Sequence, residues 1–180
     1  MTEQREEHRM SRLPTLATAS FDADLPLSCQ RLADTAYQGR LDRETRLALQ
    51  LLASPGEVPD DADPLLLRLE AKIDLTLELV LASRYPVRPA ITPCRLGLDA
   101  IAWHSEFAYP VGEPVLLTLY PNSDSALILR LAGSIDACEP SPDQPGYLLQ
   151  ADIRPSFDKT SHLQWEKWVF RRHRRAIQER

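Results

Sequence analysis

The spacing of apolar and polar positions divides the chain into three blocks. Residues 1–36 show no sustained helical stripe and are interrupted by Pro26, a pattern that predicts an N-terminal segment and one short strand. Residues 37–85 repeat leucine at intervals of three and four, which is typical of helices. Residues 86–180 begin with short apolar runs separated by turn residues and end in a mixed apolar and basic helical pattern. We therefore expect a helical insertion within a β-rich domain.

Two helices are predicted inside the middle block. The first covers residues 40–53, where Asp42 is well placed as the N-cap. The second begins at Asp63–Pro64, a cap followed by a proline suited to the first turn, and it ends before Pro86. The short connection between them predicts a helical hairpin. The apolar positions of the first helix are Leu47, Leu51 and Leu52.

The last block changes to the period of strands. Turn-rich segments such as YPNSDS and EPSPDQPG separate its apolar runs, which predicts a small antiparallel barrel or sandwich. A final helix over residues 158–178 places basic residues near its C-terminal end, where they suit the helix dipole. The predicted strands lie within residues 94–103, 114–120, 125–138 and 147–154, and the apolar positions of the final helix are Leu163, Trp165, Trp168, Val169 and Ile177.

The helix at residues 64–84 is apolar on two opposite faces, because successive residues are about 100° apart around a helix. One face follows the spacing of a coiled-coil seam. A face left in water would forgo about 1.5–3 kcal/mol for each large side chain. Either both faces are buried within one chain or one face is buried between copies in a helical bundle, and we favour the bundle. The seam consists of Leu66, Leu69, Ile73, Leu77 and Val80, and the opposite face of Ala71, Leu75, Leu79 and Ala82.

Net charge and composition limit the classes of partner and ligand that the chain is expected to bind. The net charge is -5, so DNA is not expected as a partner unless one surface is locally basic. The sequence has no run of about 18 apolar residues and no signal-peptide pattern, which predicts a cytoplasmic protein without membrane insertion. Cys29, Cys94 and Cys138 are far apart and odd in number, which favours free thiols over a disulfide framework or a zinc site.

The order of these elements resembles a known family. An arginine-containing N-terminal segment, a small barrel with this strand rhythm and a C-terminal helix ending in WVFRRHRRAI are similar to the PilZ domain, the receptor module for the bacterial second messenger cyclic di-GMP. Two long helices inserted after the first strand are similar to the atypical, tetramer-forming PilZ proteins of xanthomonads and their relatives. The resemblance covers nearly the whole chain. It implies an α+β fold, a PilZ-like antiparallel β-barrel interrupted by a long two-helix insertion and followed by a C-terminal helix.

Two motifs carry cyclic di-GMP binding in this family, and the first is RxxxR before the barrel. Its guanidinium groups pair with phosphates and stack on guanine. In this chain REEHR places Arg5 and Arg9 at that spacing, although the two glutamates between them weaken a phosphate site.

The second family motif, (D/N)xSxxG, is degenerate in this chain. Aligned on the following strand, RLGLDA occupies its place. Arg95 replaces the acid or amide, Gly97 replaces the serine, and Asp99 precedes Ala100, which replaces the closing glycine. Because these groups recognise the guanine edge, the resemblance implies weak or no direct binding of cyclic di-GMP.

Other polar clusters favour a structural interpretation. FRRHRR at residues 170–175, near Trp165 and Trp168, suits either an anion-binding stacking platform or a solvated helix end whose tryptophans pack on the barrel, and we favour the second. His, Ser and Glu are adjacent in WHSEF at residues 103–107, but successive strand residues point to opposite faces, so a turn is expected there rather than a catalytic set. We expect no enzyme activity and no cofactor.

Two functions from different classes remain. The first is a non-catalytic signalling protein of the cyclic di-GMP type, a homotetramer that acts through a protein partner in that pathway and regulates virulence or motility. The second is an oligomeric scaffold whose barrel docks a protein partner with no nucleotide role. Under the first hypothesis, changes at Arg5, Arg9 or residues 94–103 alter the response to ligand or partner. Under the second, only changes in the seam matter.

Overall fold

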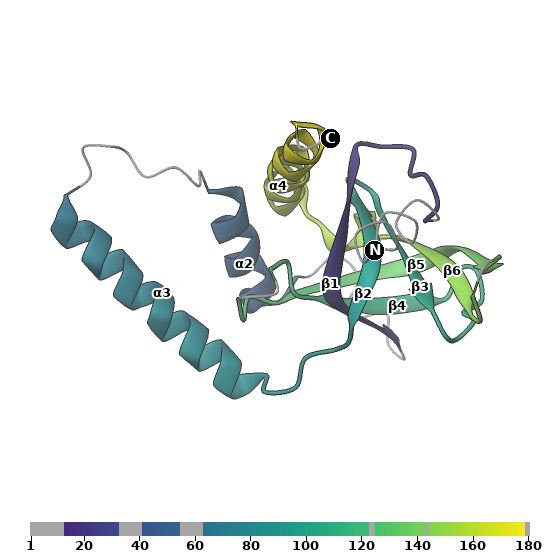
Figure 1. Cartoon of the computed structure of the whole chain (residues 1–180), viewed down its shortest axis with the longest axis horizontal. Helices are drawn as coiled ribbons and strands as arrows, with labels where there is room; N and C mark the ends of the chain where they lie inside the picture. Colours follow the sequence, from purple (N-terminus) through teal and green to yellow (C-terminus); the bar gives the residue numbers. More distant parts are fainter. Residues whose placement is uncertain (1–12, 33–40, 55–62, 123–124, 143, 179–180) are drawn as a thin grey trace, which may run out of the picture.

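The structure is a computed structural model of the chain, and it describes residues 13–32, 41–54, 63–122, 125–142 and 144–178. Within these residues six antiparallel strands close into a barrel, in the order β1-β2-β3-β6-β5-β4, and three α-helices accompany it (Figure 1). This arrangement confirms the predicted α+β fold, a barrel interrupted by two helices and followed by one. The elements are β1 (Ser20–Arg31), α2 (Arg43–Ala53), α3 (Pro64–Arg84), β2 (Ile91–Gly97), β3 (Ala100–Ser105), β4 (Pro114–Leu119), β5 (Leu129–Pro140), β6 (Tyr147–Asp152), the short 3-10 helix η2 (Arg154–Ser156) and α4 (Lys159–Gln178).

The first strand is longer than the single short strand that the sequence predicted. β1 has 12 residues, of which residues 20–26 pair with β2 and residues 27–31 pair with β4. Pro26 stands where the strand changes partner, and its carbonyl accepts a hydrogen bond from the Tyr120 N–H at 3.1 Å. Since its missing N–H falls at the junction between two ladders, the proline is tolerated inside a long strand.

The insertion does not form a helical hairpin along its length. α2 packs against α4 and β5, whereas α3 extends away from the barrel (Figure 1). The N-cap at Asp42 is confirmed, because its Oδ1 accepts a hydrogen bond from the Thr45 N–H at 2.7 Å. The predicted apolar stripe of α2 was wrong at Leu47 and Leu51, which are exposed. The side chains buried on α2 are Thr45, Ala48 and Leu49.

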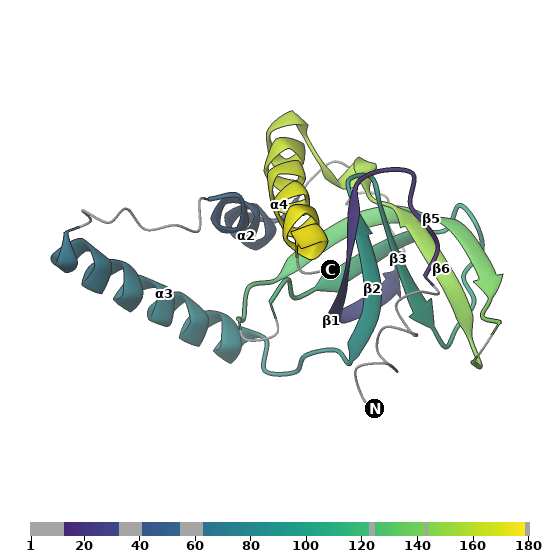
Figure 2. The same cartoon turned by 45° about the horizontal axis from the view of Figure 1, so that its top comes forward.

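The last helix, α4, closes one side of the barrel (Figure 2). Trp165 and Trp168 are buried, and the Trp168 ring meets Phe21 of β1 edge to face with centroids 5.4 Å apart. Both tryptophans therefore pack on the barrel, as favoured, and are not an open stacking platform. Leu163 and Ile177 of the same helix are exposed.

Candidate functional site

The degenerate family motif lies at the end of β2, and its first position is Arg95. The Arg95 guanidinium makes a bidentate ion pair with Asp22, directly opposite on β1, with Nε–Oδ1 at 2.6 Å and Nη2–Oδ2 at 2.9 Å. Nη1 also donates to the backbone carbonyls of Leu13 and Pro14, at 2.9 and 3.1 Å. The Arg95 and Asp22 side chains are only 15% and 13% exposed. This guanidinium is therefore committed to contacts within the chain.

Gly97, at the second motif position, is packed from two directions. A Cβ atom added there would lie 2.8 Å from Leu16 Cδ1 and 3.2 Å from Thr18 Oγ1. On the other side, the indole Nε1–H of Trp165 donates to the carbonyls of Gly97 and Leu98, both at 3.1 Å. A side chain at residue 97 would require the Leu16 side chain to shift, and its Cβ would lie 3.2 Å from the Ala100 carbonyl oxygen.

Asp99 and Ala100 complete the degenerate motif and join β2 to β3. The Asp99 carbonyl accepts a hydrogen bond from the Ile153 N–H at 2.9 Å, and its carboxylate lies 3.8 Å from His162 Nε2. Ala100 pairs with Asp152 in the β3–β6 ladder. The four motif residues thus hold together segments far apart in the sequence. Arg5 and Arg9 lie outside the described residues.

The seam of α3 is exposed in the single chain. Leu66, Leu69, Ile73 and Val80 are 53–61% exposed, and Leu77 is half-buried. The opposite face is also open, since Leu75 and Leu79 are 61% and 62% exposed. The buried residue on α3 is Leu81, near its C-terminal end. The arrangement in which one chain buries both faces is therefore wrong, and α3 carries an apolar surface without cover among the described residues.

The C-terminal end of α3 is fixed to α2 and β5 by a cluster of charged and aromatic side chains. Glu44 of α2 pairs with Arg84 at 2.7 Å and accepts a hydrogen bond from the Tyr85 hydroxyl at 2.6 Å. Arg130 of β5 lies over the Tyr85 ring, 4.7 Å from its centroid, and donates to Asp42 Oδ2 at 3.0 Å. Burial alone would raise the pKa of Asp42, but the hydrogen bonds from Thr45 and Arg130 outweigh it and lower that pKa. This cluster sets the direction in which α3 leaves the barrel.

A second contact secures α3 from its side. Glu78 accepts hydrogen bonds from the Ser125 hydroxyl and from the Ala126 N–H, the latter at 2.5 Å. The sequence pattern gave no sign of this partner for Glu78, because Ser125 is 47 residues away. Neither Glu78 nor the Arg130 cluster was found from sequence, because both depend on how distant segments meet.

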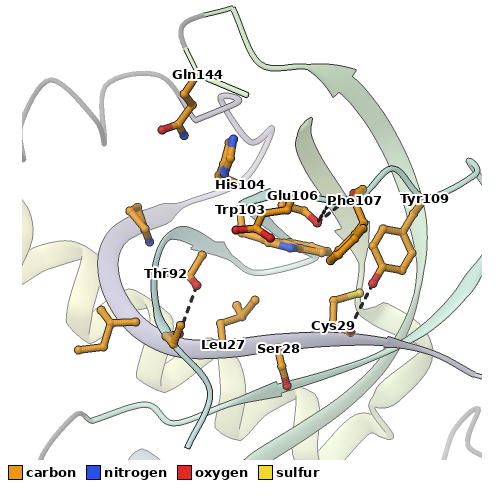
Figure 3. Close-up of a pocket in the computed structure, with 14 residues that line it drawn as sticks. Leu27, Ser28, Cys29, Thr92, Trp103, His104, Glu106, Phe107, Tyr109 and Gln144 are labelled. Atoms are coloured by element: carbon orange, nitrogen blue, oxygen red, sulfur yellow. Dashed lines mark hydrogen bonds between the residues drawn. The ribbon is translucent and has the colours of Figure 1, made fainter. Parts of the chain in front are cut away.

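A groove of about 540 Å³ lies at one end of the barrel, between β1 and the end of β3 (Figure 3). Trp103 and Phe107 lie across from Leu27 and Cys29 of β1, and the Tyr109 hydroxyl donates to the Cys29 carbonyl at 3.1 Å. A second hollow of about 540 Å³ adjoins this groove and shares His104, Glu106 and Gln144 with its lining. The sequence indicated a turn in WHSEF, whereas β3 continues through Ser105 and the turn follows it.

The arginines near the end of α4 form no ion pair with the described carboxylates, but two of them make other contacts. Arg171 donates to the carbonyls of Leu52 and Ser54 at the C-terminal end of α2, at 2.7 Å for Ser54. Arg172 lies 5.5 Å from the centroid of the Phe21 ring. These contacts join α4 to α2 and β1 and support the structural interpretation of FRRHRR.

The remaining chemical groups show no assembled reaction centre among the described residues. Cys29, Cys94 and Cys138 are free thiols, and burial raises the pKa of Cys29 to about 11 and that of Cys94 to about 12, which keeps both protonated. The described histidine, cysteine, aspartate and glutamate residues form no group of three suited to a metal ion. No helix in the described part of the chain is long and apolar enough to span a bilayer.

Comparison with known proteins gives matches among solved structures. No protein-family model and no curated protein matches the chain. Among solved structures, the chain is similar to a pathogenic protein from Xanthomonas campestris, a tetrameric PilZ domain self-assembled through an unusual helical bundle. The TM-score is 0.69 and the sequence identity 25%, over 91% of this chain and 93% of that one.

This match extends through the barrel and most of the inserted helices, since it leaves out only about a tenth of either chain. The closed antiparallel barrel, the two helices inserted after β1 and the C-terminal helix agree with it. The chain therefore has a PilZ-type fold and resembles the atypical, helix-inserted PilZ proteins that its sequence indicated.

Proposed function

We propose that the chain is a non-catalytic regulatory protein of the PilZ type, with weak or no direct affinity for cyclic di-GMP, which self-assembles through α3 and acts through a protein partner. The observation that carries this proposal is the Arg95–Asp22 pair. At the position where the family presents a group to guanine, this chain has a guanidinium already bonded to a carboxylate and two carbonyls.

Steric crowding and existing hydrogen bonds around Gly97 also oppose nucleotide binding at the degenerate motif. The serine of the family motif would need a Cβ at residue 97, where Leu16 stands 2.8 Å away. The carbonyls of Gly97 and Leu98 are occupied by the Trp165 indole. A nucleotide binding there would have to break these bonds, and each buried group left unpaired costs about 1–3 kcal/mol.

Self-assembly rests on the exposed seam of α3. Four large apolar side chains at coiled-coil spacing are more than half exposed in one chain, and an apolar patch of this kind marks an interaction site. The similar Xanthomonas campestris protein is a tetramer formed through a helical bundle. A homotetramer is therefore the favoured assembly for this chain.

A calorimetric titration of the full chain with cyclic di-GMP at modest salt tests the ligand half of the proposal. We expect no heat of binding at high ligand concentration. The titration is repeated with Arg5→Ala/Arg9→Ala and with Arg174→Ala, an exposed arginine of α4, as the matched control. Micromolar binding that is lost in the double variant and kept in the control would show a direct sensor and overturn the proposal.

The alternative function, an oligomeric scaffold with no place in nucleotide signalling, shares the assembly. It is favoured by the fact that α3 is the largest exposed apolar element among the described residues. Partner binding measured in cells at low and at high cyclic di-GMP levels separates the two, because a scaffold with no nucleotide role binds its partner equally at both levels.

A further inference from the structure

The groove at the end of the barrel exists because β2 and β3 stop pairing early. Their ladder ends at Cys94↔Trp103, so the next pair in register would join Pro93 to His104. Proline has no N–H to give to the His104 carbonyl, which removes the next ladder bond. The two strands therefore separate beyond this point, and the groove opens between β2, β3 and β1.

The separated strands leave backbone groups directed at the groove. The Leu27 N–H donates to the Ala90 carbonyl at 3.3 Å, so alternate residues of β2 face β1 and the residues between them face away. The backbone N–H and C=O of Ile91 therefore point away from β1. By the same alternation, the backbone N–H and C=O of His104 in β3 point toward β2. Among the described residues no backbone hydrogen bond joins these two edges. Such open edges accept an added strand.

The side chains of the groove suit an apolar residue. Ile91 and Phe107 line the groove and are 64% and 69% exposed, so their apolar surfaces are available to a ligand. Trp103 is buried and forms the floor, with Tyr109 beside it. The combination of aromatic floor and apolar margins is typical of a pocket that takes one anchoring side chain.

The charge of the groove indicates which residues should stand beside the anchoring side chain in a bound segment. Glu106 lines both the groove and the hollow that continues from it, and neither lining contains lysine or arginine. A lysine or arginine beside the anchoring residue would complement this rim.

We infer that this groove binds an extended segment of a partner protein, with an aliphatic or aromatic anchor over Trp103 and an adjacent lysine or arginine near Glu106. The inference rests on the proposed function, because it names the site and the chemistry of the protein partner invoked there. The segment adds to the open edges at Ile91 and His104 through its backbone, and the anchor supplies selectivity.

The test is a selection of short linear peptides displayed on phage against the immobilised full chain. We expect enrichment of sequences with an apolar residue beside lysine or arginine. One enriched peptide, synthesised with a fluorescent label, is then titrated against variants. Phe107→Ser and Ile91→Ser should each weaken binding by about tenfold or more, the loss expected for an interface anchor.

The matched control is Ile177→Ser, an equally exposed apolar residue on α4 outside the groove, which should leave the affinity unchanged. Glu106→Lys should shift the selection toward acidic flanks. Failure to enrich any sequence, or peptides that bind Phe107→Ser as well as the parent chain, would overturn the inference. If this happens while the cyclic di-GMP titration remains silent, the proposed function stands and only the groove is excluded as the partner site.

Discussion

The Asp42 side chain both caps α2 and attaches this helix to Arg130 of β5. Its Oδ1 caps α2 through the Thr45 N–H, and its Oδ2 accepts a hydrogen bond from Arg130. Both bonds favour the ionised carboxylate, which is why the pKa lies below the ordinary value of 3.8 despite the burial that would raise it. A carboxylate with a depressed pKa in the folded protein stabilises that state above its unfolded pKa, and the contribution is lost as the pH falls through the folded pKa.

Replacing Asp42 by asparagine should remove this charge while keeping an effective N-cap. We expect the free energy of unfolding to fall by about 1–2 kcal/mol near neutral pH, because a charge-assisted hydrogen bond is lost. The difference from the parent chain should disappear as the pH falls well below 3.8. Urea unfolding followed by circular dichroism at a series of pH values measures both effects.

Asp63→Asn is the control for this experiment, since Asp63 caps α3 at an exposed position. It should change stability by only a few tenths of a kcal/mol at any pH, because asparagine caps nearly as well. A pH-independent loss in Asp42→Asn would show that the cap geometry matters and the charge does not.

Individual elements have distinct energetic roles in this fold. α2 and α4 each bury part of their apolar surface on the barrel and on each other, whereas α3 leaves most of its leucines in water. Its C-terminal end is held by contacts of Arg84 and Tyr85 with Glu44 of α2. A second contact joins Glu78 of α3 to the Ala126 N–H. A helix anchored at one end with two open apolar faces supports the proposed self-assembly.

Aspartate at Ile73 or Val80 should therefore dissociate the assembly without unfolding the barrel. Each side chain is 58% exposed in one chain, so the monomer loses little, whereas an unpaired charge buried in a helical bundle is costly. Sedimentation analysis should show the mass falling to that of a single chain, with the thermal unfolding of the barrel still cooperative. Lys72→Glu, a charge change at an exposed position that belongs to neither apolar face of α3, should leave the mass unchanged. An unaltered mass in both aspartate variants would refute the seam.

The molecule as a whole is held together around the degenerate motif. Residues 13–18, β1, β2 and α4 all meet at Arg95 and Gly97 through the ion pair, the carbonyl bonds and the Trp165 indole. The region that binds ligand in the resembled family is, in this chain, a structural junction. Regulation by a partner rather than by a nucleotide is consistent with that change.

Restoring the family motif by Arg95→Asp/Gly97→Ser/Ala100→Gly should consequently fail to create a cyclic di-GMP site. The first change leaves Asp22 facing a second carboxylate at a part-buried position, where the cost approaches the about 3–5 kcal/mol of breaking a fully buried pair. The second places an atom 2.8 Å from Leu16 Cδ1. We expect a strongly lowered unfolding temperature and no heat of binding. Ala100→Gly alone should cost only about 0.5–1 kcal/mol. A triple variant with the parent's stability and new ligand binding would contradict this account.

The sequence by itself determined the helices, the strand-rich block and the family resemblance. The caps at Asp42 and Asp63 and the stop before Pro86 were correct, because helix ends depend on groups within a few residues of each other. The strand runs followed from alternation in the same way, except that the predicted run at residues 94–103 is two paired strands, β2 and β3, separated at residues 98–99. The order of elements carried the PilZ-like fold. The degenerate motif was also visible in the residues themselves.

Only the tertiary structure decided what these residues contact. Pro26 lies within one long strand because that strand pairs first with β2 and then with β4, which no local pattern reveals. Asp22 is the partner of Arg95 across 73 residues, and the groove arises where Pro93 ends a ladder. Register and docking are sums over distant contacts, so the same local pattern is compatible with several of them. In this chain those contacts turn a ligand motif into a junction and leave α3 open for assembly.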